Sequence, residues 1–218
     1  MRTRRRTART SARSALTTIA LAILVLLAWY LLAEPDGSSG ADPGDGPVVD
    51  AGGDGRDYER DLFGHGWLDP DGNGCDARND VLARDLASIT LDGDGCTVLT
   101  GILDDPYTGS QIAFARGVDT SAAVQIDHVV PLSYAWRHGA DEWDEGLRER
   151  FANDPENLLA VDGPANNAKS DSGPGEWLPG DAYVCAYADR FEAVLVEYGL
   201  TIAPEDERAL SSLAPGCR

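Results

Sequence analysis

An uninterrupted apolar run near the start of the chain constrains everything that follows it. The run, ALTTIALAILVLLAWYLLA, occupies residues 15–33, and its only polar members are two threonines. As a helix rising about 1.5 Å per residue, it would nearly cross a hydrocarbon core of roughly 30 Å. Six arginines and no acidic residue precede it. Because basic residues beside a membrane-spanning segment stay in the cytoplasm, we expect the residues after Glu34 to lie outside the cytoplasm.

Two interpretations of residues 1–33 stay open, an uncleaved signal-anchor with an Arg-rich cytoplasmic tip and a cleaved signal peptide. The length of the run favours the anchor, because the apolar part of a signal peptide is usually shorter. Leu31-Leu32-Ala33 is also a poor small-x-small cleavage site. The anchor predicts a single-pass membrane protein with an extracellular domain, and the signal peptide predicts a secreted protein.

The rest of the chain divides into a linker and one domain. Residues 34–56 are mainly Gly, Asp, Pro and Ser, with almost nothing apolar to bury, so we expect a flexible linker there. Residues 57–218 contain enough aromatic and aliphatic side chains for a single core.

The four cysteines, Cys75, Cys96, Cys185 and Cys217, all lie in the part expected outside the cytoplasm. An even number of cysteines in an exported domain favours disulfides over free buried thiols. No C-x-x-C or C-x-H pair is present, which makes a zinc site the weaker interpretation. The spacing favours the pairs Cys75–Cys96 and Cys185–Cys217.

The charge of the exported part is strongly acidic. The apolar run and its flank hold six of the 18 basic residues, so 12 basic residues stand against all 37 acidic ones, a balance of −25. Proteins that bind duplex nucleic acid strongly usually carry a basic surface. Either such a substrate is bound through a metal and a local patch, or the substrate is not a long polyanion. An acidic composition that serves solubility explains the charge equally well.

The pattern of apolar residues predicts an α+β domain rather than alternating βα units. A turn is expected at residues 105–109 between two strands of a hairpin. The expected strands are 96–102, 110–115, 124–130 and 157–161, and the expected helices are 80–88, 141–151, 164–170, 183–198 and 204–213.

Asp127 and His128 end the predicted strand VQIDHVV, directly before Pro131. A carboxylate is a hard oxygen ligand that suits Mg²⁺ or Mn²⁺. An imidazole can remove a proton from water near neutral pH. A metal and a base are what hydrolysis of a phosphodiester requires. The dipeptide alone is common, and a surface salt bridge is the competing interpretation.

A second polar segment, NLLAVDGPANNAKSDSG, begins at Asn157. Asn166, Asn167 and Lys169 lie within one turn of its predicted helix, which suits a helix that faces a metal and a phosphate. Lys169 is also the only lysine in a chain with 17 arginines. A compact point charge is therefore expected to matter at this position.

These segments together resemble the HNH (ββα-metal) nucleases, through Asp127-His128-x-x-Pro131, Asn157 and Asn166-x-x-Lys169. The wider stretch from about Tyr58 to Cys217 looks like exported bacterial proteins of this family, related to the C-terminal nuclease domain of modification-dependent restriction enzymes. The resemblance implies an HNH core, a β-hairpin plus a short metal-site helix, within a disulfide-stapled domain that has C-terminal helices.

The resemblance also implies a role for each matching residue. Asp127 resembles the acidic metal ligand, and His128 resembles the general base. Asn157 resembles the residue that fixes the loop behind the base. Asn166 resembles the second metal ligand, with its neighbour Asn167 as the alternative. Lys169 is expected either to contact phosphate or to brace the helix.

The predicted function is therefore hydrolysis of nucleic acid, DNA in the first place, with one divalent metal. Mg²⁺ is favoured, and Mn²⁺ and Zn²⁺ are the alternatives. The only other expected partner is the membrane, through residues 15–33, and no protein partner is predicted. The acidity motivates two competing functions: a non-catalytic anchored binding module, and a phosphodiesterase for small or cell-envelope phosphates.

The segment Pro131–Asn157 is long for the HNH motif and is expected either to cap the cleft or to add core.

A second metal site is considered at Asp69-x-Asp71-x-Asn73-Gly74, whose spacing fits the start of an EF-hand-like calcium loop. The twelfth position is Asp80 instead of the usual Glu, and no convincing helix precedes the loop. The sequence favours an ordinary Gly/Asp turn that leads into a helix and keeps a structural Ca²⁺ as the alternative.

Overall fold

The computed structural model describes residues 57–117 and 120–217. The predicted anchor and linker lie outside these residues. Among the described residues, no helix is both long enough and apolar enough to cross a membrane.

The described chain combines helices with two antiparallel sheets, which agrees with the predicted α+β class. The strands are β1 (Leu86–Leu91), β2 (Val98–Asp104), β3 (Gln111–Ala115), β4 (Val124–His128) and β5 (Leu158–Asp162). The α-helices are α2 (Ala77–Asp85), α3 (Leu132–Arg137), α4 (Glu145–Ala152), α5 (Gly163–Lys169), α6 (Val184–Tyr198) and α7 (Pro204–Leu213). The short 3₁₀ turns are η1 (Arg60–Phe63), η2 (Ser121–Ala123) and η3 (Ala140–Glu142).

The larger sheet has the order β1-β2-β3, and the predicted hairpin between β2 and β3 is confirmed. The turn at residues 105–109 is closed by the side chain of Asp105, which accepts hydrogen bonds from the backbone and hydroxyl of Thr108. Gly109 follows with φ +71°, a backbone conformation that glycine adopts without strain. This turn also brings Tyr107 toward the second sheet.

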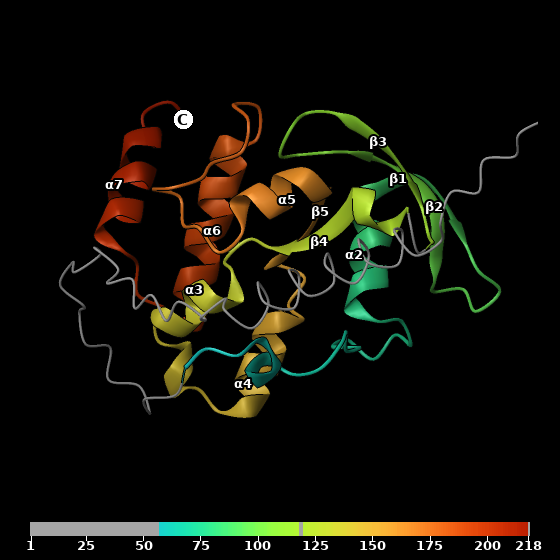
Figure 1. Cartoon of the computed structure of the whole chain (residues 1–218), viewed down its shortest axis with the longest axis horizontal. Coiled ribbons are helices and arrows are strands. Elements are labelled where there is room, and N and C mark those ends of the chain that lie inside the picture. Colours follow the sequence, from blue (N-terminus) through green and yellow to red (C-terminus); the bar gives the residue numbers. More distant parts are fainter. Residues whose placement is uncertain (1–56, 118–119, 218) are drawn as a thin grey trace, which may run out of the picture. The chain divides into compact units, whose positions relative to one another are not determined.

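The second sheet pairs β4 with β5, although a long segment separates them in sequence. Alternate side chains of the pair point into two different cores. Val124, Ile126 and Leu158 face the core formed with α2 and the three-stranded sheet, while Leu159 and Val161 face the core formed with α3, α4, α6 and α7. Helix α5 packs directly against this pair, and α6 and α7 lie beyond it (Figure 1). The pair therefore lies buried between the two halves of the domain.

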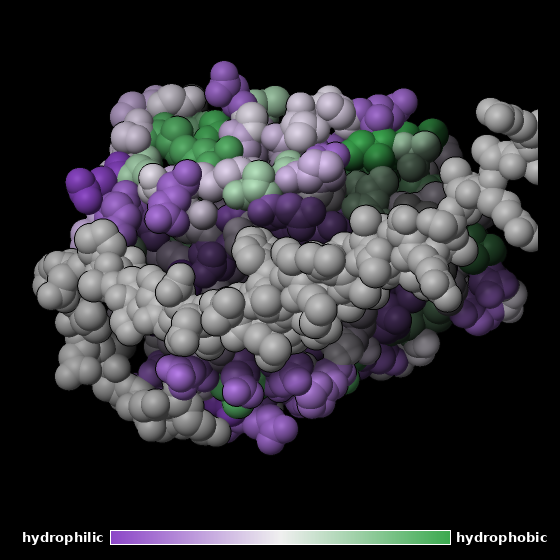
Figure 2. Space-filling view, viewed as in Figure 1, coloured by the Kyte–Doolittle hydropathy of each residue, from purple (hydrophilic) through white to green (hydrophobic). Residues whose placement is uncertain are grey.

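The apolar side chains that remain on the surface are few. On the face shown in Figure 2, they gather in two separate patches, one over α6 and α7 and one over the three-stranded sheet. Leu91 and Ile102 of that sheet are 42% and 36% exposed.

The predicted helix over residues 80–88 is wrong at both ends. The helix begins earlier because the side chain of Asp76 accepts a hydrogen bond from the backbone of Asn79 and caps it. It ends at Asp85, and Leu86 starts strand β1 without an intervening loop. Strand β1 was missed because its apolar residues continue the helical pattern, and only pairing with β2 fixes them as a strand.

The predicted helix over residues 141–151 is divided in two. Trp143 has an extended backbone, and Asp144 caps the new helix α4 by accepting from Leu147. The sequence prediction also missed α3, which begins at Leu132 directly after the extended Pro131. The remaining predicted helices agree with α5, α6 and α7 to within one residue.

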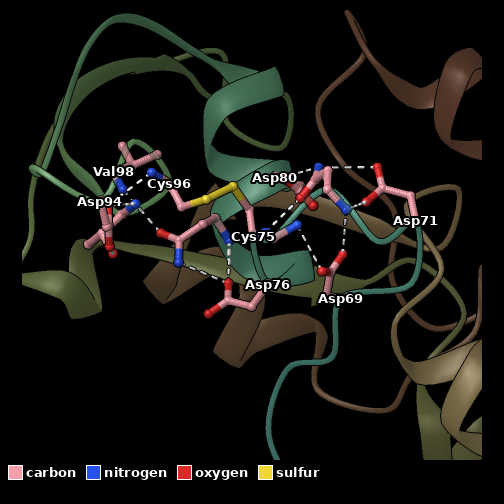
Figure 3. The surroundings of a disulfide bond; sticks show 12 residues. Asp69, Asp71, Cys75, Asp76, Asp80, Asp94, Cys96 and Val98 are labelled. Atoms are coloured by element: carbon pink, nitrogen blue, oxygen red, sulfur yellow. Dashed lines mark hydrogen bonds between the residues drawn. A yellow bond between two sulfur atoms is a disulfide. The ribbon is translucent and has the colours of Figure 1, made fainter.

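Both predicted disulfides are confirmed. Cys75–Cys96 joins the residues before α2 to the turn before β2 (Figure 3). Cys185–Cys217 joins the first turn of α6 to the residues after α7. No free cysteine remains among the described residues. Each bridge therefore closes a loop that includes at least one helix or strand of the domain.

Replacing either cysteine pair with serine is expected to lower the free energy of unfolding. The chain-entropy model gives about 3–4 kcal/mol for loops of 21 and 32 residues. Urea denaturation of the Cys75→Ser/Cys96→Ser and Cys185→Ser/Cys217→Ser proteins, compared with the wild type, measures both losses. An unchanged midpoint for either variant would show that its bridge does not stabilise the fold.

Candidate active site

A polar pocket of about 400 Å³ lies along one edge of β4. Four consecutive β4 residues, from Gln125 to His128, line it. Because side chains alternate between the faces of a strand, four consecutive residues can share a pocket only along the strand edge. The other edge of β4 is occupied by β5. The pocket is completed by α5, by the start of α3 and by residues near η1.

Helix α5 is held close to β4 by the residues at its start. Asp162 caps it by accepting a hydrogen bond from the backbone of Ala165 at 2.8 Å, and Pro164 occupies its first turn. A Cβ atom on Gly163 would lie 2.1 Å from the carbonyl oxygen of Ala122. This close approach requires glycine, and it sets α5 against the beginning of β4.

Asp127 and Lys169 form a buried ion pair between β4 and α5. The Lys169 ammonium lies 3.0 Å from Asp127 Oδ2 and donates to Oδ1 at 3.1 Å. It also donates to the backbone oxygen of His128 at 2.9 Å, and none of its surface is exposed. Lys169 does not line the pocket. Of the two roles expected for Lys169, bracing the helix agrees with this position.

Tyr107 is a third member of this cluster and was missed by the sequence prediction. Its hydroxyl donates a hydrogen bond to Asp127 Oδ2. Burial raises the pKa of Tyr107 well above its usual value, so the hydroxyl remains a donor. Burial raises the pKa of Asp127 as well, while Lys169 and Tyr107 act in the opposite direction. Burial lowers the pKa of Lys169, and Asp127 opposes this shift. Each charge therefore depends on the other for its stability.

His128 is buried at the end of β4, with its orientation fixed on two sides. Its Nε2 atom lies 2.8 Å from the backbone oxygen of Ala152, and its ring stacks on Trp67 with a centroid distance of 6.1 Å. A carbonyl oxygen only accepts, so Nε2 carries the proton and Nδ1 has a free lone pair. Burial lowers the pKa of His128 to about 4, and Arg60 is one of the cations that lower it further. The imidazole is therefore neutral near neutral pH.

Asn157 lies behind this histidine and is completely buried. Its side chain accepts a hydrogen bond from the backbone N–H of Val130 at 2.8 Å and donates to the Val130 oxygen at 3.1 Å. Its own backbone oxygen accepts from Val129 at 2.8 Å. These bonds fix the residues directly after His128.

Asn166 and Asn167 both line the pocket from α5. The Asn166 amide nitrogen donates to Gln125 Oε1 at 2.9 Å, which leaves its Oδ1 atom as a possible ligand. The sequence prediction therefore grouped residues that the structure brings together: Asp127, His128 and both asparagines share one pocket.

The donors in this pocket fit a sparse Mg²⁺ or Mn²⁺ site. Asp127 and Asn166 offer a carboxylate and an amide oxygen, and Mg²⁺ commonly binds one or two protein oxygens together with water and phosphate. Among the described residues, no cluster of three or more His, Cys, Asp or Glu side chains could hold a metal.

The loop proposed for calcium is closed by its own hydrogen bonds (Figure 3). Asp69 accepts from the backbone of Gly72, Asn73 and Gly74, and these bonds lower its pKa. The Asn73 amide bonds to Asp71 and to Asp80. Helix α2 begins soon after it, as the turn interpretation expects. A structural Ca²⁺ at Asp69, Asp71 and Asn73 stays a prediction.

Comparison with known protein families places the domain in one of them. The model of the family described as GmrSD restriction endonucleases, C-terminal domain, matches residues 76–212. The chain belongs to this family. It is also 39% identical over 163 residues to an uncharacterized secreted protein of Arthroderma benhamiae, covering 73% of this chain and 76% of that protein. No solved structure matches. The expected relation to restriction-enzyme nuclease domains is confirmed. The expected bacterial origin is not shown, and this relative is fungal.

The buried pair predicts a specific pattern of stability changes. Lys169→Met leaves the Asp127 carboxylate buried without a countercharge and is expected to cost about 3–5 kcal/mol. Adding Asp127→Asn should recover most of this loss, because the remaining amide can still accept from Tyr107. The free energies of unfolding of the wild type, both single variants and the double variant measure the coupling. If the losses of the two single variants add up in the double variant, the pairing is contradicted. Arg208→Met, on the exposed face of α7, is the control, and its free energy of unfolding should change little.

Proposed function

We propose that the domain is a metal-dependent endonuclease of the HNH type that hydrolyses phosphodiester bonds, with DNA as the favoured substrate. The observation that carries this proposal is the state of His128. Its Nε2–H is held by Ala152 at 2.8 Å, so a neutral imidazole with a free Nδ1 lies in the same pocket as Asp127 and Asn166. Membership of a restriction endonuclease family supports a nuclease function independently.

The order of the elements around the pocket supports the HNH type. Two antiparallel strands, β4 and β5, are followed at once by the short helix α5. The first strand ends on the proposed base, and the helix carries the proposed second ligand. The same order of strand, strand and helix is what the resemblance to ββα-metal nucleases implies.

Asp127 and Asn166 are the residues that would hold the divalent cation. When bound, this cation would neutralise charge on the phosphate and stabilise the leaving oxygen. The Asp127 carboxylate is restrained because it accepts hydrogen bonds from both Lys169 and Tyr107. A restrained ligand needs little reorganisation when the substrate binds.

His128 would act on the attacking water. Nδ1 accepts one proton from the water, whose oxygen forms a bond to phosphorus while the ester bond to the leaving oxygen breaks. The leaving oxygen takes a proton from solvent, and the imidazolium then returns its proton to solvent. The Ala152 carbonyl favours the transient cation because Nε2–H continues to donate to it. Stacking on Trp67 keeps the ring in the orientation that exposes Nδ1.

We also propose that the domain acts outside the cytoplasm. Two disulfides are typical of oxidising compartments, and the fungal relative is named a secreted protein. Anchoring of the domain by residues 15–33 is part of this proposal, with cleavage and secretion as its alternative.

The acidity of the exported part favours a second candidate, a phosphodiesterase for small or cell-envelope phosphates. A balance of −25 opposes the approach of a long polyanion. Comparing the rates of hydrolysis of plasmid DNA and of bis-p-nitrophenyl phosphate distinguishes the nuclease from this phosphodiesterase. No turnover of either one would instead favour the non-catalytic binding module.

Nuclease activity and its dependence on His128 are tested together. The purified protein is expected to nick plasmid DNA with Mg²⁺ or Mn²⁺ and to lose this activity in EDTA. His128→Ala should reduce the rate by at least about 100-fold, because general base catalysis commonly contributes that much. His65→Ala is the matched control, since His65 is exposed and does not line the pocket. Equal, EDTA-insensitive rates for the wild type and His128→Ala would refute the proposal.

The two asparagines of α5 can be assigned by metal dependence. Asn166→Ala is expected to raise the Mg²⁺ concentration for half-maximal activity by more than about tenfold, because a ligand is lost. Asn167→Ala should change this concentration far less. The opposite ranking would assign the metal to Asn167 and shift the ligand register by one residue.

A further inference from the structure

The residues before the family-matched region form one wall of the pocket. Tyr58 and Arg60 line the main pocket together with residues of β4, α3 and α5. Arg60 also lines an adjoining pocket of about 150 Å³ that contains Trp67 and His128. Since the family match begins at residue 76, this wall lies outside the region by which the family is recognised.

The backbone of this wall is fixed by the core below it. Phe63 is 2% exposed and packs against Trp136 and Phe151, with ring centroids 6.3 and 6.0 Å apart. The backbone oxygen of Leu62 accepts a hydrogen bond at 2.9 Å from Arg148 Nε, which is itself buried. The turn η1 is therefore held in place, while the Arg60 side chain at its start is exposed.

Arg60 contributes the unbalanced charge of the pocket. The other charged residues in the lining are Asp127, which is paired with Lys169, and Asp171, which is paired with Arg137 at 3.0 Å. Within residues 57–117 and 120–217, Arg60 forms neither a hydrogen bond nor a salt bridge with another side chain. With these two pairs counted as neutral, Arg60 leaves one positive charge in the pocket of a strongly acidic protein.

We propose that Arg60 binds the phosphate of the substrate beside His128. A guanidinium presents paired N–H donors that match two phosphate oxygens, and it keeps its charge at every relevant pH. Because Arg60, Asp127 and Asn166 line the same pocket, one phosphate would contact both Arg60 and the cation that Asp127 and Asn166 would hold. It would also stabilise the negative charge that develops as water attacks. This inference rests on the proposed function and names the residue that offsets the acidity of the protein locally.

Binding of a fluorescein-labelled DNA duplex, measured by anisotropy as a function of salt, tests Arg60 without cleavage. The full-length His128→Ala protein with Mg²⁺ is the parent. Adding Arg60→Met is expected to weaken binding by about 10- to 100-fold, the effect of losing a charged hydrogen bond. It should also lower the slope of log affinity against log salt by about 0.9, because one phosphate contact is lost. Arg60→Lys should keep most of the slope, because the charge remains.

Arg208→Met is the matched control, since it removes the same charge from an exposed position on α7. The proposal is overturned if Arg60→Met binds with the affinity and salt slope of its parent, if Arg208→Met weakens binding equally, or if the parent does not bind the duplex. Cleavage is measured separately with the wild-type protein, which retains His128. If the duplex is bound through Arg60 but the wild-type protein does not cleave it, the nuclease proposal is refuted and the proposed role of Arg60 in binding stands.

Discussion

The buried ion pair between Lys169 and Asp127 joins the helix of the candidate site to the strand that carries the proposed base. Neither charge would be stable at this depth alone, because an unpaired buried ion loses its hydration without compensation. Lys169 adds a hydrogen bond to the backbone of His128, and Tyr107 adds one to Asp127. The pair thus fixes the spacing between β4 and α5, on which the position of Asn166 depends.

The segment between β4 and β5 supplies the other half of this support. The sequence left open whether it caps the cleft or adds core. Tyr134 and Trp136 are buried, so the segment adds core, but it also brings the Ala152 oxygen to His128. At its end, Asn157 closes back on Val130. The long segment between β4 and β5 therefore serves both packing and the orientation of the imidazole.

Sequence patterns predicted the parts of this protein that depend on local chemistry. Pro204 opens α7 at the expected residue, and the spacing of the cysteines gave both disulfides. Strand β1 was missed because its identity depends on pairing with β2. Arg60 and Tyr107 gave no signal, because neither stands beside another site residue in sequence. Folding alone brings Arg60 to the pocket and Tyr107 to Asp127, so only the three-dimensional structure could reveal them.

The charge of the protein remains the main physical constraint on the proposed chemistry. An acidic body repels a nucleic acid at long range, so binding must depend on short-range contacts, on the cation and on Arg60.

The most direct test of the proposed metal site is the anomalous scattering of Mn²⁺ in crystals of the protein. The account predicts a peak about 2.0–2.2 Å from oxygens of both Asp127 and Asn166. No peak there, or one confined to the Asp69–Asp71 loop, would contradict it.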